Sequence, residues 1–219
     1  GGNPLLDPFR ADTYDISLEW YFAEESLLAL GLFYKDIGTF VQNTRETRPY
    51  NTSGLPDYLL IGTGALPTDD FQFNVPINTP GGPLQGLELS YQQPFSFLPD
   101  FWSNFGTQLN YTYVDSKIQY LTSTGLDSLN TDLTGLSKNA FNATLYYEGE
   151  RLSARVSGAY RDSYLTTVPC RNSNDVEGTK RSTNIDDSAS WKLNDQWELT
   201  FEGLNLTDEY SDQWVDSNA

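Results

Sequence analysis

The chain has 219 residues, with 30 Asp or Glu against 13 Lys or Arg, so its formal net charge is −17 at pH 7. This charge argues against nucleic acid as a partner, because phosphate binding needs a basic surface. The sequence has no His and a single Cys, Cys170. These counts exclude His-based acid–base catalysis, His metal ligands and a disulfide within the chain.

The composition favours strands over helices. Tyr, Phe, Trp and Gly number 14, 12, 5 and 17, and such residues are typical of strands and turns. No apolar run approaches about 20 residues, so a transmembrane helix is excluded. A polar composition still fits a membrane barrel, since half of each strand faces a polar lumen. The first residues, GGNPLLDP, lack basic and apolar regions, so we expect any signal peptide to be absent or removed.

Residues 11–22 predict a first strand after a Pro-containing loop, because apolar and polar side chains alternate. The apolar positions are Tyr14, Ile16, Leu18, Trp20 and Phe22. The polar positions include Asp15 and Glu19, which require water on that side of the strand. A short turn leads to a second strand at residues 27–48, whose polar half, residues 36–48, is expected to stand clear of a bilayer.

Residues 49–83 form a connection of about 35 residues, far longer than the usual ~4–6. Within it, residues 71–77 are expected to extend the sheet briefly. Strands at residues 84–95 and 104–117 follow, joined by a modest turn that contains Trp102. Residues 118–137 are predicted to be a second long loop.

Residues 139–164 give the clearest pattern, a hairpin with a turn at residues 148–151. One face carries Phe141, Ala143, Leu145 and Tyr147 before the turn, and Leu152, Ala154, Val156 and Tyr160 after it. Each arm has about a dozen residues, above the ~5–6 of a globular strand and enough for the roughly 9–11 that cross a bilayer. Tyr147 and Tyr160 lie near the ends of the apolar face, as in the aromatic girdles of membrane barrels.

A third long loop, residues 165–179, contains Cys170, either as a free thiol or as the partner of a Cys outside this chain. The last strand pair is predicted at residues 180–193 and 196–206, and residues 207–219 read as the start of another loop. Connections thus alternate between short and long, as in outer-membrane barrels. The predicted fold is an all-β, antiparallel transmembrane barrel segment of about eight long strands. The alternative is a secreted sandwich or solenoid.

Several stretches resemble the second half of the barrel of TonB-dependent outer-membrane receptors. They are NPLLDP from residue 3, ADTYDISLEWYF from residue 11, LGLFYKDI from residue 30 and GLELSYQ from residue 86. The stretch SWKLNDQWELTFEGLNLTDEY, from residue 190, is similar to the penultimate hairpin of the family and the box that follows it. The resemblance extends over nearly the whole chain, in the order of the family.

This resemblance implies a 22-stranded barrel filled by a plug, in the outer membrane of a Gram-negative bacterium. Residues 1–219 would then be roughly strands 14–21, without the plug, the TonB box or the closing strand. The implied partners are the TonB–ExbB–ExbD complex, acting through the plug, outer-membrane lipid and lipopolysaccharide, and a small nutrient. Eight strands alone would leave two unpaired edges in lipid, so we expect the chain to be part of a larger protein.

Aromatic and polar loop residues are the candidate ligand contacts, since rings stack on sugar faces and rigid ring systems. The candidates are Arg48, Tyr50, Tyr58, Phe71, Phe73 and Trp214, with Arg155 added as a cation in the middle of a strand on its polar face. Packing of the loops themselves is the alternative role for the aromatics. The charged residues on the polar faces of the strands could contact a plug or a passing substrate, and ordinary solvation or pairing with one another is the alternative. These residues are Glu19, Lys35, Glu88, Arg155, Arg161 and Lys192.

The sequence offers no catalytic signature. A nucleophile elbow, a phosphate loop and zinc-ligand spacing are all missing. Asp186 and Asp187 are adjacent in a strand and point to opposite faces, so they cannot form a dyad. Loop pairs such as Asp69–Asp70 and Asp208–Glu209 lack EF-hand spacing. We expect no enzyme activity, no metal and no cofactor.

The expected function is uptake of a nutrient at the extracellular loops, with carbohydrate as the first substrate. An iron–siderophore is the second, because an acidic protein repels the anionic charge that many ferric siderophores carry. A secreted all-β carbohydrate-binding module or adhesin is the alternative from another class. A passive porin is a third alternative.

Overall fold

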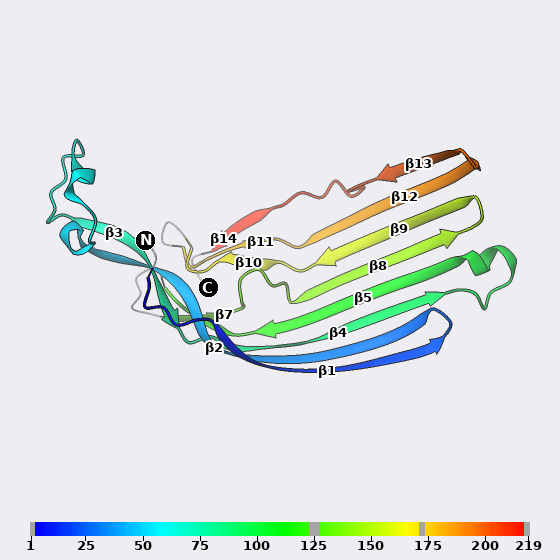
Figure 1. Cartoon of the computed structure of the whole chain (residues 1–219), viewed down its shortest axis with the longest axis horizontal. Coiled ribbons are helices and arrows are strands. Elements are labelled where there is room, and N and C mark those ends of the chain that lie inside the picture. Colours follow the sequence, from blue (N-terminus) through cyan, green and yellow to red (C-terminus); the bar gives the residue numbers. More distant parts are fainter. Residues whose placement is uncertain (1–2, 123–127, 171–173, 217–219) are drawn as a thin grey trace.

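The computed structural model describes residues 3–122, 128–170 and 174–216, and it confirms the all-β antiparallel prediction. Eight long strands form one sheet in chain order (Figure 1). They are β1 (Arg10–Ala23), β2 (Ser26–Pro49), β4 (Gly82–Pro94), β5 (Phe105–Ser116), β8 (Asn139–Glu148), β9 (Leu152–Arg161), β12 (Ser182–Asn194) and β13 (Trp197–Gly203). In the described part of the chain, no helix has the length and apolar character that a membrane span requires.

The register of the sheet lines up apolar side chains in continuous rows on one face, the outer face. One such row crosses six strands through Leu18, Leu30, Leu89, Tyr111, Phe141 and Tyr160. The next position along each strand points to the other face, the inner face, where the matching row is polar or small. That row contains Glu19, Ala29, Ser90, Asn110, Asn142 and Ala159.

The outer face is not covered by any other described part of the chain. Ile16 is 72% exposed, Val156 is 51% exposed and Phe201 is 64% exposed. A soluble sandwich would bury such a face against a second sheet. Large contiguous apolar surfaces of this kind mark contact with a membrane or a partner, which agrees with the predicted lipid-facing side.

The connections sort to the two ends of the sheet, which we name the turn rim and the loop rim. At the turn rim lie the hairpin connections 24–25, 95–104, 149–151 and 195–196, and the described parts of the other connections lie at the loop rim (Figure 1). Outer-membrane barrels have short periplasmic turns and longer extracellular loops. This sorting agrees with the predicted barrel, in which the loop rim would be the extracellular one.

The long connections contain more regular structure than the sequence predicted. The expected short extension is β3 (Asp70–Thr79), which pairs with the far half of β2. The prediction of plain loops was wrong at β6 (Ile118–Leu121), β7 (Ser128–Thr131), β10 (Tyr164–Thr167), β11 (Val176–Thr179) and β14 (Gln213–Asp216). These strands have four residues each, too few for an alternation pattern to stand out in the sequence.

A small apolar core closes the loop rim on the inner side of the sheet. Ile118 and Tyr120 of β6 are 0% and 2% exposed and pack against Ile37 of β2 and Leu84 of β4. Gln42 of β2 is 4% exposed, and its side chain binds the backbone of β6. Its Nε2 donates to the carbonyl of Gln119 at 2.7 Å, and its Oε1 accepts from the backbone N–H of Leu121 at 3.0 Å. Strand β6 is therefore held on the inner side of the wall.

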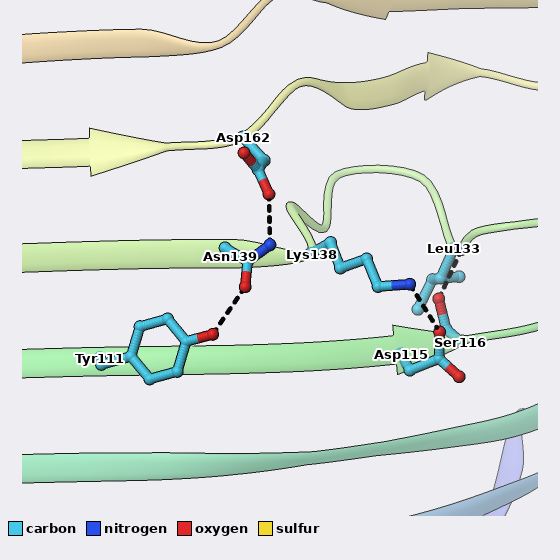
Figure 2. A network of polar contacts seen from close by, with 7 residues as sticks. All are labelled: Tyr111, Asp115, Ser116, Leu133, Lys138, Asn139 and Asp162. Atoms are coloured by element: carbon cyan, nitrogen blue, oxygen red, sulfur yellow. Dashed lines mark hydrogen bonds and ion pairs between the residues drawn. The ribbon is translucent and has the colours of Figure 1, made fainter.

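Polar contacts connect Lys138 and Asn139, at the start of β8, to β5 and to Asp162, which follows β9 (Figure 2). The side chain of Asn139 accepts from the Tyr111 hydroxyl at 2.7 Å and donates to the Asp162 carboxylate at 2.6 Å. Lys138 donates to Asp115 at 3.3 Å, and this hydrogen bond raises the pKa of Lys138. Hydrogen bonds from the Tyr160 hydroxyl, first, and from Asn139 lower the pKa of Asp162.

The two faces predict opposite responses to the same substitution. Leu145 is 49% exposed on the outer face, so Leu145→Arg in the intact protein should destabilise the membrane-inserted state. The expected cost is about 2–4 kcal/mol near the bilayer centre and less near the interface. The control Thr144→Arg places the same cation on the inner face, where water solvates it. For each variant, the stability of the inserted state is measured as the fraction of protein that migrates as the heat-modifiable folded form after refolding into bilayers. Equal losses in the two variants would contradict the assignment of the faces.

The lowered pKa of Asp162 predicts that the loop loosens in acid. A carboxylate with a depressed folded-state pKa contributes its full stabilisation above the ordinary value of 3.8. That stabilisation is lost as the pH falls through the folded-state value. Hydrogen exchange of residues 133–138, corrected for intrinsic rates, should show protection that declines on acidification. Asp162→Asn should show weak protection that no longer depends on pH in this range, and an unchanged pH profile in this variant would refute the role of Asp162.

Candidate functional site

Four predicted ligand contacts gather in one cluster on the β2–β3 arm, where they contact one another. Tyr50 is 4% exposed, donates its hydroxyl to the carbonyl of Pro56 at 2.8 Å, and packs edge-on against Phe71 with ring centroids 5.4 Å apart. Burial, followed by the nearby charge of Asp57, raises the pKa of Tyr50. The arrangement of these two rings anchors the tip of the arm.

Arg48 and Phe73 form the second half of this cluster. The guanidinium carbon of Arg48 lies 5.0 Å from the ring centroid of Phe73, within the range of a cation–π contact. Its Nη1 lies 3.9 Å from a carboxylate oxygen of Glu46. Both side chains are therefore engaged inside the arm, and a ligand that used them would have to share or displace these contacts.

Tyr58 differs from the other residues of the arm because its ring is open to solvent. It lies in the short 3-10 turn η2 (Asp57–Leu60), beside η1 (Tyr50–Thr52), and is 66% exposed. Leu60 of the same turn is 9% exposed and holds the turn against the arm. The structure thus presents Tyr58 as a ring that can stack on a ligand.

Trp214 lies elsewhere, on β14 at the loop rim. Trp214 pairs in register with Gly178 of β11, and a Cβ atom added at position 178 would lie 2.6 Å from the indole ring of Trp214. The ring therefore rests on the glycine, and this close approach needs a residue without a side chain. Trp214 is half-buried in a packing contact that joins two segments of the chain.

Arg155 stands apart from all the loop candidates, on the inner face of β9 between Tyr146 and Ser188. It borders two small hollows of about 220 and 200 Å³, the second lined also by Asp186 and Glu202. None of the three ion pairs found in the described residues includes Arg155. The predicted site residues therefore occupy three separate places, the β2–β3 arm, β14 and the inner face of β9, and do not form a single pocket.

A larger concavity lies on the inner face at the loop rim, and we name it the mouth cavity. It has a volume of about 390 Å³ and is bordered by Thr112, Asn142, Arg161, Ser182 and Asn184 of the sheet and by Gly135, Leu136 and Ser137 of the loop. Amide, hydroxyl and guanidinium groups from β5, β8, β9 and β12 line it together with the apolar side chains of Val114, Leu136, Ala140 and Ala159. Such an arrangement can hydrogen-bond a polar ligand, and it holds no group positioned for covalent chemistry.

Arg161 joins the loop to the wall of the mouth cavity. Its Nε donates to the Ser137 hydroxyl at 2.8 Å, and its Nη2 donates to the carbonyl of Gly135 at 3.1 Å. Its guanidinium carbon lies 3.9 Å from the ring centroid of Tyr164. The three contacts hold the cation in one orientation at the border of the cavity.

Sequence reasoning placed Arg161 among the polar-face charges but did not select it, and it did not select Asn142 or Asn184. Alternation alone puts Asn142 and Arg161 on the polar face, and the hairpin turn sets them on adjacent strands. The fold of residues 133–137 over them was not predictable from the alternation pattern. That fold is what converts a polar wall into a cavity.

The acidic pairs and Cys170 have ordinary surroundings. Asp69 accepts from the backbone N–H of Leu66 and Asp186 from that of Asn205. The thiol of Cys170 lies 3.3 Å from a carboxylate oxygen of Glu177. In the ranges that the structure describes, no group of three or more Cys, Asp or Glu side chains is arranged to hold a metal ion.

Three solved structures similar to this chain are siderophore or ferric enterobactin receptors of bacteria. The siderophore receptors PiuA and PirA from Acinetobacter baumannii align with TM-scores of 0.60 and 0.59, at 18% and 14% identity over 98% and 93% of this chain. A variant of the ferric enterobactin receptor PfeA from Pseudomonas aeruginosa aligns with a TM-score of 0.56, at 15% identity over 92% of this chain. The chain spans only 26–28% of the length of these proteins.

No curated protein matches the sequence. The family described as "TonB dependent receptor-like, beta-barrel" matches residues 1–206, which is nearly the whole chain. The barrels of this family lie in the outer membrane of Gram-negative bacteria, and its members are transporters rather than enzymes. With the antiparallel sheet of its long strands, its bare apolar face and its sorted loops, this chain belongs to the barrel domain of the TonB-dependent receptor family.

Proposed function

We propose that the protein containing this chain actively imports a small nutrient across the outer membrane, and that the chain supplies part of the barrel wall and of the ligand-binding mouth. The mouth cavity carries this proposal. It lies on the inner face, at the extracellular rim, under a loop that hydrogen bonds fix to the wall. A ligand held there would be on the route into the lumen.

Residues 1–219 would form roughly strands 14–21 of a 22-stranded barrel. Energy would come from the TonB–ExbB–ExbD complex, acting through a plug in the rest of the protein. The outer strands of the sheet, β1 and β13, support this assignment because each has one strand neighbour in the sheet order. An unpaired edge is unfavourable in lipid, and further strands of a closed barrel would pair both edges.

Carbohydrate is the proposed substrate on the basis of the cavity lining. Asn142, Asn184, Ser182 and Thr112 present amides and hydroxyls, which match the donors and acceptors of a hydroxylated ligand. The exposed ring of Tyr58 could stack on a sugar face. An iron–siderophore is the second candidate, supported by the similar structures, which are siderophore and ferric enterobactin receptors.

Energy dependence separates this proposal from a passive porin. Cells that express the intact protein should accumulate radiolabelled substrate only when TonB is present, whereas binding of substrate to the cell surface should persist without TonB. A panel of labelled oligosaccharides and ferric siderophores identifies the substrate class. Accumulation that continues in cells lacking TonB would contradict the proposal and favour passive diffusion.

The mouth cavity itself can be tested with two asparagines that are cross-strand neighbours. Asn142 borders the cavity and pairs in register with Asn110, which does not border it. Losing one hydrogen bond to the substrate costs about 0.5–1.5 kcal/mol, so Asn142→Ala should weaken binding by about two- to tenfold. Asn110→Ala is the matched control and should leave affinity unchanged. Calorimetry with the purified intact protein measures both, and equal affinities for the two variants would exclude the cavity as the binding site.

A further inference from the structure

The connection between β4 and β5 differs from the other turns at the turn rim. The other hairpin connections there consist of residues 24–25, 149–151 and 195–196, and each contains at least one charged side chain. The β4–β5 connection, residues 95–104, has the sequence FSFLPDFWSN and one charged residue, Asp100. It includes the 3-10 turn η3 (Asp100–Asn104). We name this segment the aromatic turn.

The aromatic turn leaves three large apolar side chains open. Phe97 is 66% exposed, Phe101 is 55% exposed and Trp102 is 58% exposed. A water-facing turn of a membrane barrel has no reason to expose three rings together, because each loses the benefit of burial. Their exposure points to a surface that is covered in the membrane.

The rings of the aromatic turn are continuous with the outer face of the sheet. Phe101 packs against Phe105 and Tyr147, with ring centroids 5.4 and 5.1 Å apart, and Trp102 packs against Phe105 at 5.6 Å. Phe105 and Tyr147 are paired residues of β5 and β8 on the lipid-facing side. The turn therefore extends the lipid-facing surface beyond the ends of the strands.

Three backbone N–H groups of the aromatic turn also have partners within or beside the turn. Phe95 N–H donates to the carbonyl of Phe105 at 2.7 Å, Leu98 N–H to that of Phe95 at 2.8 Å, and Trp102 N–H to that of Pro99 at 3.2 Å. Peptide groups with internal partners are what an environment of low polarity requires. The turn can thus enter the interfacial layer without leaving these donors unpaired.

We propose that the aromatic turn is a membrane anchor that inserts Phe97, Phe101 and Trp102 into the interfacial layer of the periplasmic leaflet. The occupant of its surface is phospholipid, which the continuity with the lipid-facing side of β5 and β8 favours over a protein partner. Tryptophan is the side chain best suited to this depth, because its ring is apolar and its N–H reaches the headgroups. Asp100, which is exposed, would remain on the water side.

Fluorescence quenching of Trp102 tests this proposal. The intact receptor is reconstituted in bilayers of phosphatidylcholine, either plain or brominated near the carbonyl end of the acyl chains. The signal of Trp102 is the difference between the unmodified protein and Trp102→Phe. As a matched control, Glu150→Trp is introduced into the Trp102→Phe background, which moves one turn tryptophan into the short charged connection 149–151 on the same rim.

The proposal predicts that brominated lipid quenches Trp102 whereas aqueous acrylamide quenches it weakly. The tryptophan introduced at position 150 should show the reverse. Quenching of Trp102 by acrylamide to the same extent as the control would overturn the proposal. Shielding of Trp102 from both quenchers would overturn it as well, because the turn would then be covered by protein.

Discussion

The structure depends on the alternation of side chains along an antiparallel ladder with a fixed register. Because neighbouring residues point to opposite faces, the register that places Leu18 beside Leu30 also places Glu19 beside Ala29. A slip of one residue would exchange the two faces of a strand. On β1 that slip would move Asp15 and Glu19 to the lipid side, at a large cost in free energy. One geometric rule thus sets the membrane face, the lumen face and the place of every charge on the wall.

The same rule explains why binding features concentrate at the loop rim. Across the span of the sheet, the outer face is largely apolar, with Asp187 beside Val156 as a charged residue on it, and the inner face carries mostly small and polar groups. Beyond the span, the chain is free to fold back, and residues 118–121 and 133–137 do so over the inner face. A small core around Ile118 and Tyr120 and the contacts of Arg161 then hold the loop in place. The mouth cavity forms between this loop and the polar wall.

Much of the fold could be predicted from the sequence because its long strands repeat a strong local pattern. The β8–β9 hairpin, with Phe141 opposite Tyr160 and Leu145 opposite Val156, follows the predicted alternation. The four-residue strands of the loops were missed because they are too short to show alternation, and because the contacts that fix β6 come from distant β2. Gln42, for example, lies within the second predicted strand, and nothing in its local sequence indicates that it binds β6.

The candidate site was less predictable than the fold for a related reason. Aromatic residues in loops suggest ligand contacts, but their type does not distinguish a ring that packs from a ring that binds. In the structure Tyr50 and Phe71 pack together, whereas Tyr58 remains open. The lining of the mouth cavity comes from four strands and a loop, so it appears only once the register and the fold of the loop are known. Asn142 and Arg161 carry no motif that would distinguish them from other polar wall residues.

The most direct test of the account is a site-directed spin-label scan of residues 141–147 on β8, a strand flanked by β5 and β9. Single cysteines are introduced into the intact receptor after Cys170 and any other cysteine are replaced, and the collision rates of the label with oxygen and with a water-soluble nickel complex are compared in bilayers. We expect the collision rate with oxygen to vary with a period of two residues. It should be high at positions 141, 143, 145 and 147 and low at the positions between them. Absence of this alternation, or nickel accessibility at the odd positions, would contradict a sheet that presents its apolar face to lipid.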